Sequence, residues 1–303
     1  MRTTRVLCLL LAVSLLLSSL WCEISCGDDS LPVGRESLID KYHKIERELR
    51  KSSFALPFFI ESSVSKNASQ VDIYGTFKYS FDIVQDELLV PTNWCEILLP
   101  HVNVRACTYK QVNDTWLLNI YNVKKFSEPL EDAYQMKFAY RVSELQSGYF
   151  DISLVAPEGP FSTKGHQFGL EAIPLDEGGT LIHLRYSYSY SPLAYFLMKL
   201  FGGSKVGFSL TGTDSGGNPV YVDGLRGSVE RNVACYYLAI LAYLDTRKSP
   251  AERRFENRIS QWYDLAGRFK QHLLEMEKEE YLSWKRQDRK NQQRLQSDLN
   301  RYQ

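Results

Sequence analysis

The sequence has no excess of charge of either sign. Its 36 lysine and arginine residues are matched by 36 aspartate and glutamate residues. Proteins that bind nucleic acids need clustered, uncompensated positive charge to contact phosphates, so this balance argues against a nucleic-acid partner. Apolar residues make up 44% of the chain and charged residues 24%, close to the average for globular proteins. Long disordered, collagen-like and purely coiled-coil chains are therefore excluded.

Motifs for metal, cofactor and redox chemistry are missing as well. The six cysteines contain no C-x-x-C pair, which excludes zinc ribbons and thioredoxin-like sites. None of the five histidines stands in an H-E-x-x-H motif. His166 and His183 fall on neighbouring expected strands, with Glu171 close in sequence, but a metal site would still lack a clear third ligand. We expect both histidines to face solvent, and we assign neither a metal nor a cofactor.

No residues stand at the spacing of a catalytic site. Residues 214–217, Asp-Ser-Gly-Gly, overlap the nucleophile motif of trypsin-like proteases. That chemistry requires a histidine base and a buried aspartate on a double β-barrel, whereas this tetrapeptide stands in a glycine-rich turn. No catalytic residue is assigned, and the sequence favours a protein that is not an enzyme.

The start of the chain has the pattern of a secretory signal. Arg2 and Arg5 precede an uncharged apolar stretch, Val6 to Trp21, whose sixteen residues are fewer than the about 20 that span a membrane. We expect residues 1–26 to be a signal peptide and the protein to be periplasmic or secreted. An uncleaved anchor is the alternative.

Export changes how the cysteines are interpreted. Cys95 and Cys107 stand twelve residues apart and can pair in an oxidising compartment, so we predict a disulfide with Cα atoms within about 7 Å. Cys235 lies in an apolar run and is expected to be buried. A lipoprotein would carry its lipid on Cys26, or less well on Cys22, although the residues before each fit a lipobox poorly.

Hydrophobic periodicity predicts the order of the elements. An amphipathic helix over Arg35–Lys51 lies in an N-terminal helical segment, residues 27–70, and Val71–Asp82 alternates strictly as a long strand. Short helices broken at Pro91 follow over Glu87–His101. Six further antiparallel strands are predicted over Val104–Lys110, Thr115–Tyr121, Tyr134–Val142, Gly148–Ala156, Gly165–Ile173 and Gly179–Tyr190.

The C-terminal part is predicted to be mostly helical. A helix and a hairpin are inserted over residues 192–222, and Leu225–Asp245 reads as a long helix with a wide apolar stripe. Residues 249–303 form a helical extension whose apolar residues should cover the outer side of that helix. Beyond Glu277 it is highly charged, and two interpretations stay open: a solvated helix, or one that meets a protein partner or an anionic membrane surface. In the second interpretation, the residues that contact the partner or membrane surface are Tyr281, Leu282, Trp284, Lys285, Arg286, Arg289 and Lys290.

This order of elements resembles the START-like superfamily, also called SRPBCC, in which a curved sheet wraps around a long helix. Asp86–His101, with its two prolines and Trp94, resembles the helix pair after the first strand of that fold. Gly224-Leu-Arg-Gly227 through Tyr243 resembles the start of its long helix. The resemblance implies an α+β helix-grip fold over residues 71–248: a curved antiparallel sheet around a long C-terminal helix, with one extra C-terminal helix. The insertion and the tail depart from the minimal fold.

The resemblance also implies a deep apolar cavity that holds lipids, sterols, polyketides or other hydrophobic molecules. Aromatic residues make up 13% of the chain, and their rings can either line such a cavity or fill the core. The candidate cavity-lining residues are Tyr186, Tyr188, Tyr190, Val229, Val233, Tyr236, Tyr237 and Ile240.

We therefore expect an exported, non-enzymatic binder or carrier of a hydrophobic small molecule or lipid. The alternative is a structural or interaction protein of the cell envelope that acts through residues 249–303. An enzyme such as a cyclase comes third, because members of the resembled superfamily sometimes catalyse without an obvious motif.

The signal peptide gives a first testable prediction. The mature protein should begin after Trp21 and no later than Asp28, because the apolar stretch ends at Trp21 and the small residues before Asp28 suit a signal peptidase. Mass spectrometry of the N-terminus of the exported protein measures this. A product that retains Met1 would contradict cleavage.

Overall fold

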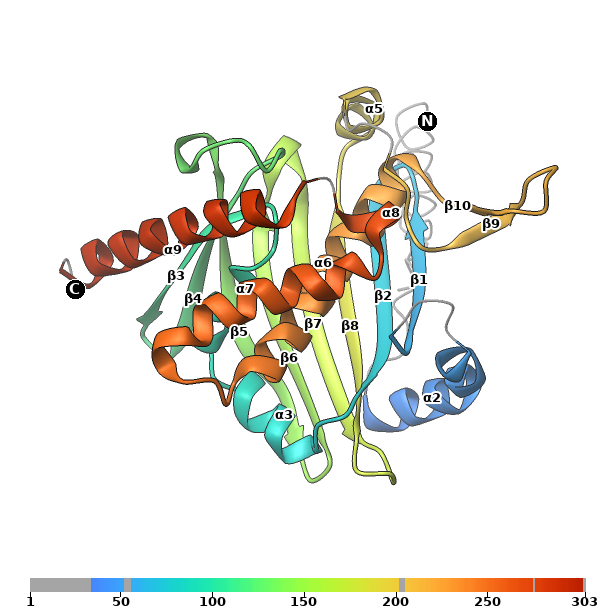
Figure 1. Cartoon of the computed structure of the whole chain (residues 1–303), viewed down its shortest axis with the longest axis horizontal. Coiled ribbons are helices and arrows are strands. Elements are labelled where there is room, and N and C mark those ends of the chain that lie inside the picture. The colour runs from blue at the N-terminus through green and yellow to red at the C-terminus, as the bar shows by residue number, and fades with distance from the viewer. Residues whose placement is uncertain (1–33, 52–55, 202–204, 275, 302–303) are drawn as a thin grey trace, which may run out of the picture. The chain divides into compact units, whose positions relative to one another are not determined.

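Eight antiparallel strands form one curved sheet, and the long helix α6 (Gly224–Thr246) crosses the face that we call inner (Figure 1). The structure is a computed structural model that describes residues 34–51, 56–201, 205–274 and 276–301. The strand order is β1-β2-β8-β7-β6-β5-β4-β3. This is the α+β helix-grip arrangement that the order of elements predicts. The predicted signal peptide lies outside the described residues.

The strands follow the predicted order, with ends that differ by a few residues. Alternation along β2 places Val71, Ile73 and Phe77 on the inner face, where all three are buried. The strands are β1 (Phe58–Val64), β2 (Ala68–Phe77), β3 (Val104–Val112), β4 (Thr115–Asn122), β5 (Tyr134–Gln146), β6 (Tyr149–Glu158), β7 (Lys164–Pro174) and β8 (Thr180–Ser189).

The segment before β2 corrects the sequence analysis, which predicts residues 27–70 to be helical. The predicted helix is present as α2 (Arg35–Arg50), but β1 follows it and pairs with β2 at the edge of the sheet. β1 is missed because its sequence, F-F-I-E-S-S-V, does not alternate between apolar and polar residues. The predicted boundary at residue 71 therefore falls inside the sheet. The insertion holds α5 (Pro192–Phe201) and the hairpin β9 (Leu210–Thr213) to β10 (Pro219–Tyr221).

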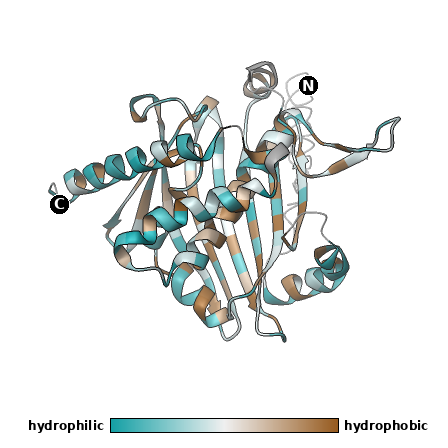
Figure 2. Cartoon of the chain, viewed as in Figure 1, coloured by the Kyte–Doolittle hydropathy of each residue, from teal (hydrophilic) through white to brown (hydrophobic). Residues whose placement is uncertain are grey.

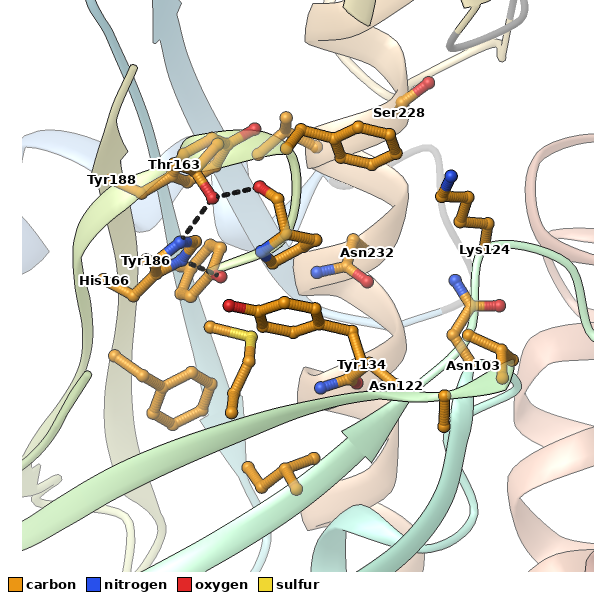
Figure 3. A pocket seen from close by; sticks show the side chains of 18 of the residues that line it. Asn103, Asn122, Lys124, Tyr134, Thr163, His166, Tyr186, Tyr188, Ser228 and Asn232 are labelled. Carbon is orange, nitrogen blue, oxygen red and sulfur yellow. Dashed lines mark hydrogen bonds between the residues drawn. The ribbon is translucent and has the colours of Figure 1, made fainter. Parts of the chain in front are cut away.

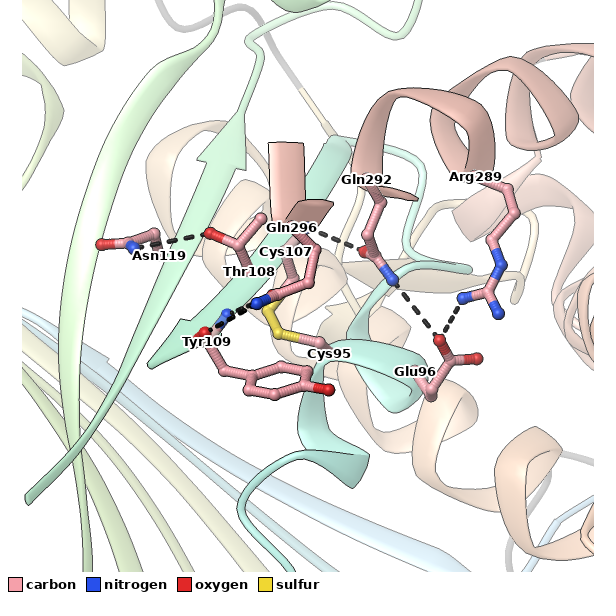
Figure 4. The surroundings of a disulfide bond; sticks show 9 residues. All are labelled: Cys95, Glu96, Cys107, Thr108, Tyr109, Asn119, Arg289, Gln292 and Gln296. Atoms are coloured by element: carbon pink, nitrogen blue, oxygen red, sulfur yellow. Dashed lines mark hydrogen bonds and ion pairs between the residues drawn. A yellow bond between two sulfur atoms is a disulfide. The ribbon is translucent and has the colours of Figure 1, made fainter. Parts of the chain in front are cut away.

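Two short helices, α3 (Phe81–Leu88) and α4 (Asn93–Leu98), stand on either side of Pro91. Cys95 of α4 forms a disulfide with Cys107 of β3, and their Cα atoms are 4.9 Å apart (Figure 4). This distance lies inside the predicted limit of about 7 Å. The bond ties the helix pair to β3, the strand at one edge of the sheet.

Helix α6 is covered on both sides. Val233 and Ile240 are fully buried in the core between α6 and the sheet. On the other side lies α7 (Ala251–Gly267), whose fully buried Trp262 donates its indole N–H to the carbonyl oxygen of Cys235 at 3.1 Å. The predicted cover over the outer side of the long helix is thus formed by α7.

In its described residues, the C-terminal extension contains three helices where one was predicted: α7, α8 (Lys270–Leu273) and α9 (Lys278–Arg301). Although α9 is largely hydrophilic (Figure 2), Tyr281 and Lys285 are almost fully buried against the rest of the chain. The prediction that this charged helix is either solvated or free for a partner is wrong for these two side chains.

Polar side chains of α9 bond to the strand at the edge of the sheet. The amide oxygen of Gln292 accepts from the Cys107 N–H at 2.9 Å. The side chain of Gln296 accepts from the N–H of Tyr109 and donates to its carbonyl oxygen, at 2.9 and 3.0 Å (Figure 4). Backbone groups of β3 that have no strand partner on this side are therefore satisfied by a helix.

The outer face of the sheet carries α2 and a buried polar cluster. Leu38 and Ile45 of α2 pack on outer-face residues, and beneath the helix His183 lies between two carboxylates. Its Nδ1 is 2.7 Å from Glu171 and its Nε2 is 2.7 Å from Asp72. Burial alone lowers the pKa of His183, but the hydrogen bonds to Asp72 and Glu171 outweigh it and hold the pKa above its usual value. The prediction of a solvent-facing His183 is wrong.

Replacing His183 tests this cluster. The His183→Ala variant should lose about 3–5 kcal/mol of unfolding free energy, because Glu171 would remain buried without a cation and Asp72 would keep only Arg185, at 3.1 Å. Urea denaturation measures the loss. His43→Ala on the exposed side of α2 is the matched control and should change stability by less than about 0.5 kcal/mol. Equal effects of the two substitutions would show that the pairing does not stabilise the fold.

Candidate functional site

A cavity of about 760 Å³ lies between the inner face of the sheet and the N-terminal half of α6 (Figure 3). The helix contributes one face with Val229, Asn232 and Tyr236, spaced three or four residues apart. The C-terminal half of α6 is packed tightly against the sheet instead. The helix is thus gripped at one end and leaves space at the other.

The deeper wall of the cavity is apolar. It is formed by side chains that alternate toward the inner face of β4 to β7, together with one residue of α4. These residues are Leu98, Ile120, Met136, Phe138, Leu154 and Phe168. Such a wall suits a hydrophobic molecule, and the volume lies within the about 300–1,000 Å³ typical of ligand pockets.

Polar residues of the cavity lining, such as Asn122, Lys124 and Thr163, lie at or just beyond the ends of strands. Lys124 and Phe161, from two different loops, meet at the rim, with the Lys124 ammonium 4.3 Å from the centre of the Phe161 ring. Phe161 and Ser162 both have positive φ angles, near 60°, which residues with a side chain rarely adopt. The surrounding contacts hold this loop in a strained conformation beside the cavity.

Four of the eight predicted residues line the cavity: Tyr186, Tyr188, Val229 and Tyr236. The alternation of β8 places both strand tyrosines on the inner face. Tyr236 stacks on His101, with ring centres 4.2 Å apart, and meets Phe168 edge-on. Their role in binding a ligand is taken up below as a proposal.

The other four predicted residues lie outside the cavity wall. Tyr190 lies just beyond the end of β8, and its hydroxyl donates to the carbonyl oxygens of Ser65 and Ala68. Tyr237 packs toward β2, where a Cβ at position 75 would collide with its hydroxyl, so only glycine fits there. Val233 and Ile240 fill the core on the side of α6 that packs against the sheet. For these residues the filled-core interpretation is correct.

His166 is the cavity residue that sequence reasoning misjudges. It is 3% exposed and faces inward, whereas the sequence analysis expects it to face solvent. Its Nε2 is 2.8 Å from the Thr163 hydroxyl and its Nδ1 is 2.7 Å from the Tyr186 hydroxyl (Figure 3). Its position two residues before Phe168 on an alternating strand is the signal that could have identified it.

The contacts around His166 fix both its orientation and its charge. Its ring is stacked on that of Tyr188, with centres 5.0 Å apart. A Cβ at position 159 would collide with the His166 imidazole and crowd the Thr163 hydroxyl, so Gly159 makes room for their contact. Burial lowers the pKa of His166 to about 4, and the imidazole is therefore neutral at physiological pH.

The arrangement does not resemble a metal centre. His166 and His183 lie on opposite faces of the sheet, because one faces the cavity and the other the cluster beneath α2. Among the described residues, no group of three histidine, cysteine, aspartate or glutamate side chains is placed to hold a metal ion. What the cavity offers is an apolar wall and a few hydrogen-bonding groups.

No protein-family model and no curated protein matches the sequence. Among solved structures, the chain is similar to the Zhui aromatase/cyclase from Streptomyces sp. R1128, with 12% identity over 61% of this chain and 98% of that chain, and a TM-score of 0.38. A STAR-related lipid transfer protein from Xanthomonas axonopodis is 11% identical over 62% of this chain and 93% of that chain, with a TM-score of 0.38. Human StAR-related lipid transfer protein 5 is 10% identical over 52% of this chain and 84% of that chain, with a TM-score of 0.30. At such low identities and TM-scores, the functional argument rests on this chain's own cavity.

Two core substitutions separate the filled half of the grip from the open half. Ile240→Ala should cost about 2–5 kcal/mol of unfolding free energy and leave the binding of apolar probes unchanged, because Ile240 is fully buried and does not border the cavity. Met136→Ala should cost less and alter probe affinity, since it enlarges a space that already exists. Denaturant melts with and without probe measure both effects. If neither variant changes stability or binding, the inner face of α6 is misassigned.

Proposed function

We propose that the protein is an exported, non-enzymatic binder or carrier of a hydrophobic small molecule, which it holds between the sheet and α6. The observation that carries this proposal is the cavity of about 760 Å³ with an apolar inner wall. A water-filled cavity of this size with apolar walls is costly, because water gains few hydrogen bonds there. Filling it with an apolar molecule removes that cost.

The disulfide supports the exported part of the proposal. Cys95 and Cys107 are both almost fully buried, and they are bonded in the part of the chain that the structure describes. Such bonds persist mainly in oxidising compartments outside the cytosol. The signal-like pattern of residues 1–26 agrees with this. In the described part of the chain, no helix has both the length and the apolar character needed to cross a membrane.

The alternative, an adaptor that works through residues 249–303, has less support. Several residues assigned to a partner surface instead bond within the chain. Arg286 pairs with Glu256 at 2.9 Å, and Arg289 pairs with Glu96. α7 also fills the core over α6. Deletion of residues 249–303 is therefore expected to unfold the protein, and it cannot separate a carrier from an adaptor.

Filling the cavity tests the carrier hypothesis. Val229→Trp should at least halve the lipid-like material that copurifies with the protein and should weaken its binding of an apolar fluorescent dye, because the larger ring occupies the ligand's space. Val142→Trp is the matched control, since Val142 is 43% exposed and lies away from the cavity. Organic extraction followed by mass spectrometry, together with dye titration, measures both variants.

Measurements on the wild-type protein decide whether the carrier function is correct. If it carries no apolar molecule and binds no apolar dye, the carrier function is wrong. Binding that is lost equally in both tryptophan variants would place the ligand somewhere other than this cavity.

A further inference from the structure

The polar wall of the cavity contains a chain of hydrogen bonds with a fixed direction. The Thr163 hydroxyl donates to the carbonyl oxygen of Pro160 at 2.6 Å. A hydroxyl has one proton, so the oxygen of Thr163 must accept in its 2.8 Å contact with Nε2 of His166. The proton of the imidazole is therefore on Nε2, and it points away from Tyr186.

The other nitrogen of this imidazole must then be an acceptor. His166 is neutral, because it is buried and its ring nitrogens contact only the two hydroxyls of Thr163 and Tyr186 among the described residues. A neutral imidazole with its proton on Nε2 has a lone pair on Nδ1. The Tyr186 hydroxyl, 2.7 Å away, therefore donates its only proton to His166.

This leaves the oxygen of Tyr186 with lone pairs and no proton to offer to the cavity. Tyr186 lines the cavity, and among the described residues no other hydrogen-bond partner of its hydroxyl is present (Figure 3). Burial raises the pKa of Tyr186 well above its usual value, so the phenol keeps its proton and remains bonded to His166. A ligand group at this point can form a hydrogen bond with Tyr186 only by donating a proton to its oxygen.

We propose that Tyr186, held by His166 and Thr163, accepts a hydrogen bond from a hydroxyl group of the ligand, so that the cavity selects hydrophobic alcohols or phenols over ethers and ketones of the same shape. This preference rests on the proposed binding function and specifies its ligand class. An ether or ketone offers no proton, and its oxygen would face the oxygen of Tyr186 without a hydrogen bond. That mismatch weakens binding because both oxygens lose water without gaining a partner.

Three naphthalene probes of similar shape test the preference: 2-naphthol, 2-methoxynaphthalene and 2-acetylnaphthalene. Calorimetric titration of the mature protein should show 2-naphthol binding about three- to tenfold more tightly than the ether or the ketone. Tyr186→Phe should bind all three with the affinity that the wild type shows for the ether, because it keeps the ring and removes the accepting oxygen.

A second variant reverses the direction of the hydrogen bond. In His166→Phe the Tyr186 hydroxyl has no imidazole to donate to, so its proton becomes free for the ligand and 2-acetylnaphthalene should gain affinity relative to the ether. A residue that merely supports packing would change the affinity for the three probes in parallel. Circular dichroism and thermal melts establish that each variant is folded.

The outcomes separate this inference from the function on which it rests. Equal affinities for the three probes in the wild type, or a preference for 2-naphthol that persists in Tyr186→Phe, would overturn the hydroxyl preference and leave a cavity that binds apolar molecules. Failure of all three probes to bind the wild type would overturn the binding function, and the preference with it.

Discussion

The burial of α6 on both sides is the constraint on which the rest of the structure depends. A helix between a sheet and a second helix cannot present a polar stripe to either neighbour, and Ala239 and Ala242 are accordingly as buried on one side as Val233 and Ile240 are on the other. β2 and α7 both pack apolar side chains against this one helix. The C-terminal extension is thus part of the core.

The inward side of α6 borders the cavity with some residues and fills the core with their immediate neighbours. Val229 borders the cavity, whereas Val233 does not. Tyr236 and Tyr237 are adjacent in sequence, yet one faces the cavity and the other fills the core toward β2. The heavy aromatic content of the chain serves both purposes: rings fill the closed half and form the walls of the open half.

Sequence patterns predict the fold better than they predict the cavity. Alternation and helical spacing identify seven of the eight sheet strands, the long helix and the disulfide, because each depends on a local period or on a pair of cysteines. The inward face of β8 is also local, so Tyr186 and Tyr188 are found. How far α6 stays against the sheet depends on contacts between distant segments, which no local period records. For that reason Val233 and Ile240 are misplaced on the cavity wall.

The glutamines of α9 also cover one edge of the sheet. Among the described residues, β3 has a strand neighbour on one side only. The unpaired side of such a strand is a template on which another chain can add and start aggregation. Gln292 and Gln296 occupy backbone groups of Cys107 and Tyr109 that an added strand would use. Proteolytic loss of the last turns of α9 would uncover this template. A polar helix with no place in the cavity thereby blocks strand addition at this edge of the sheet.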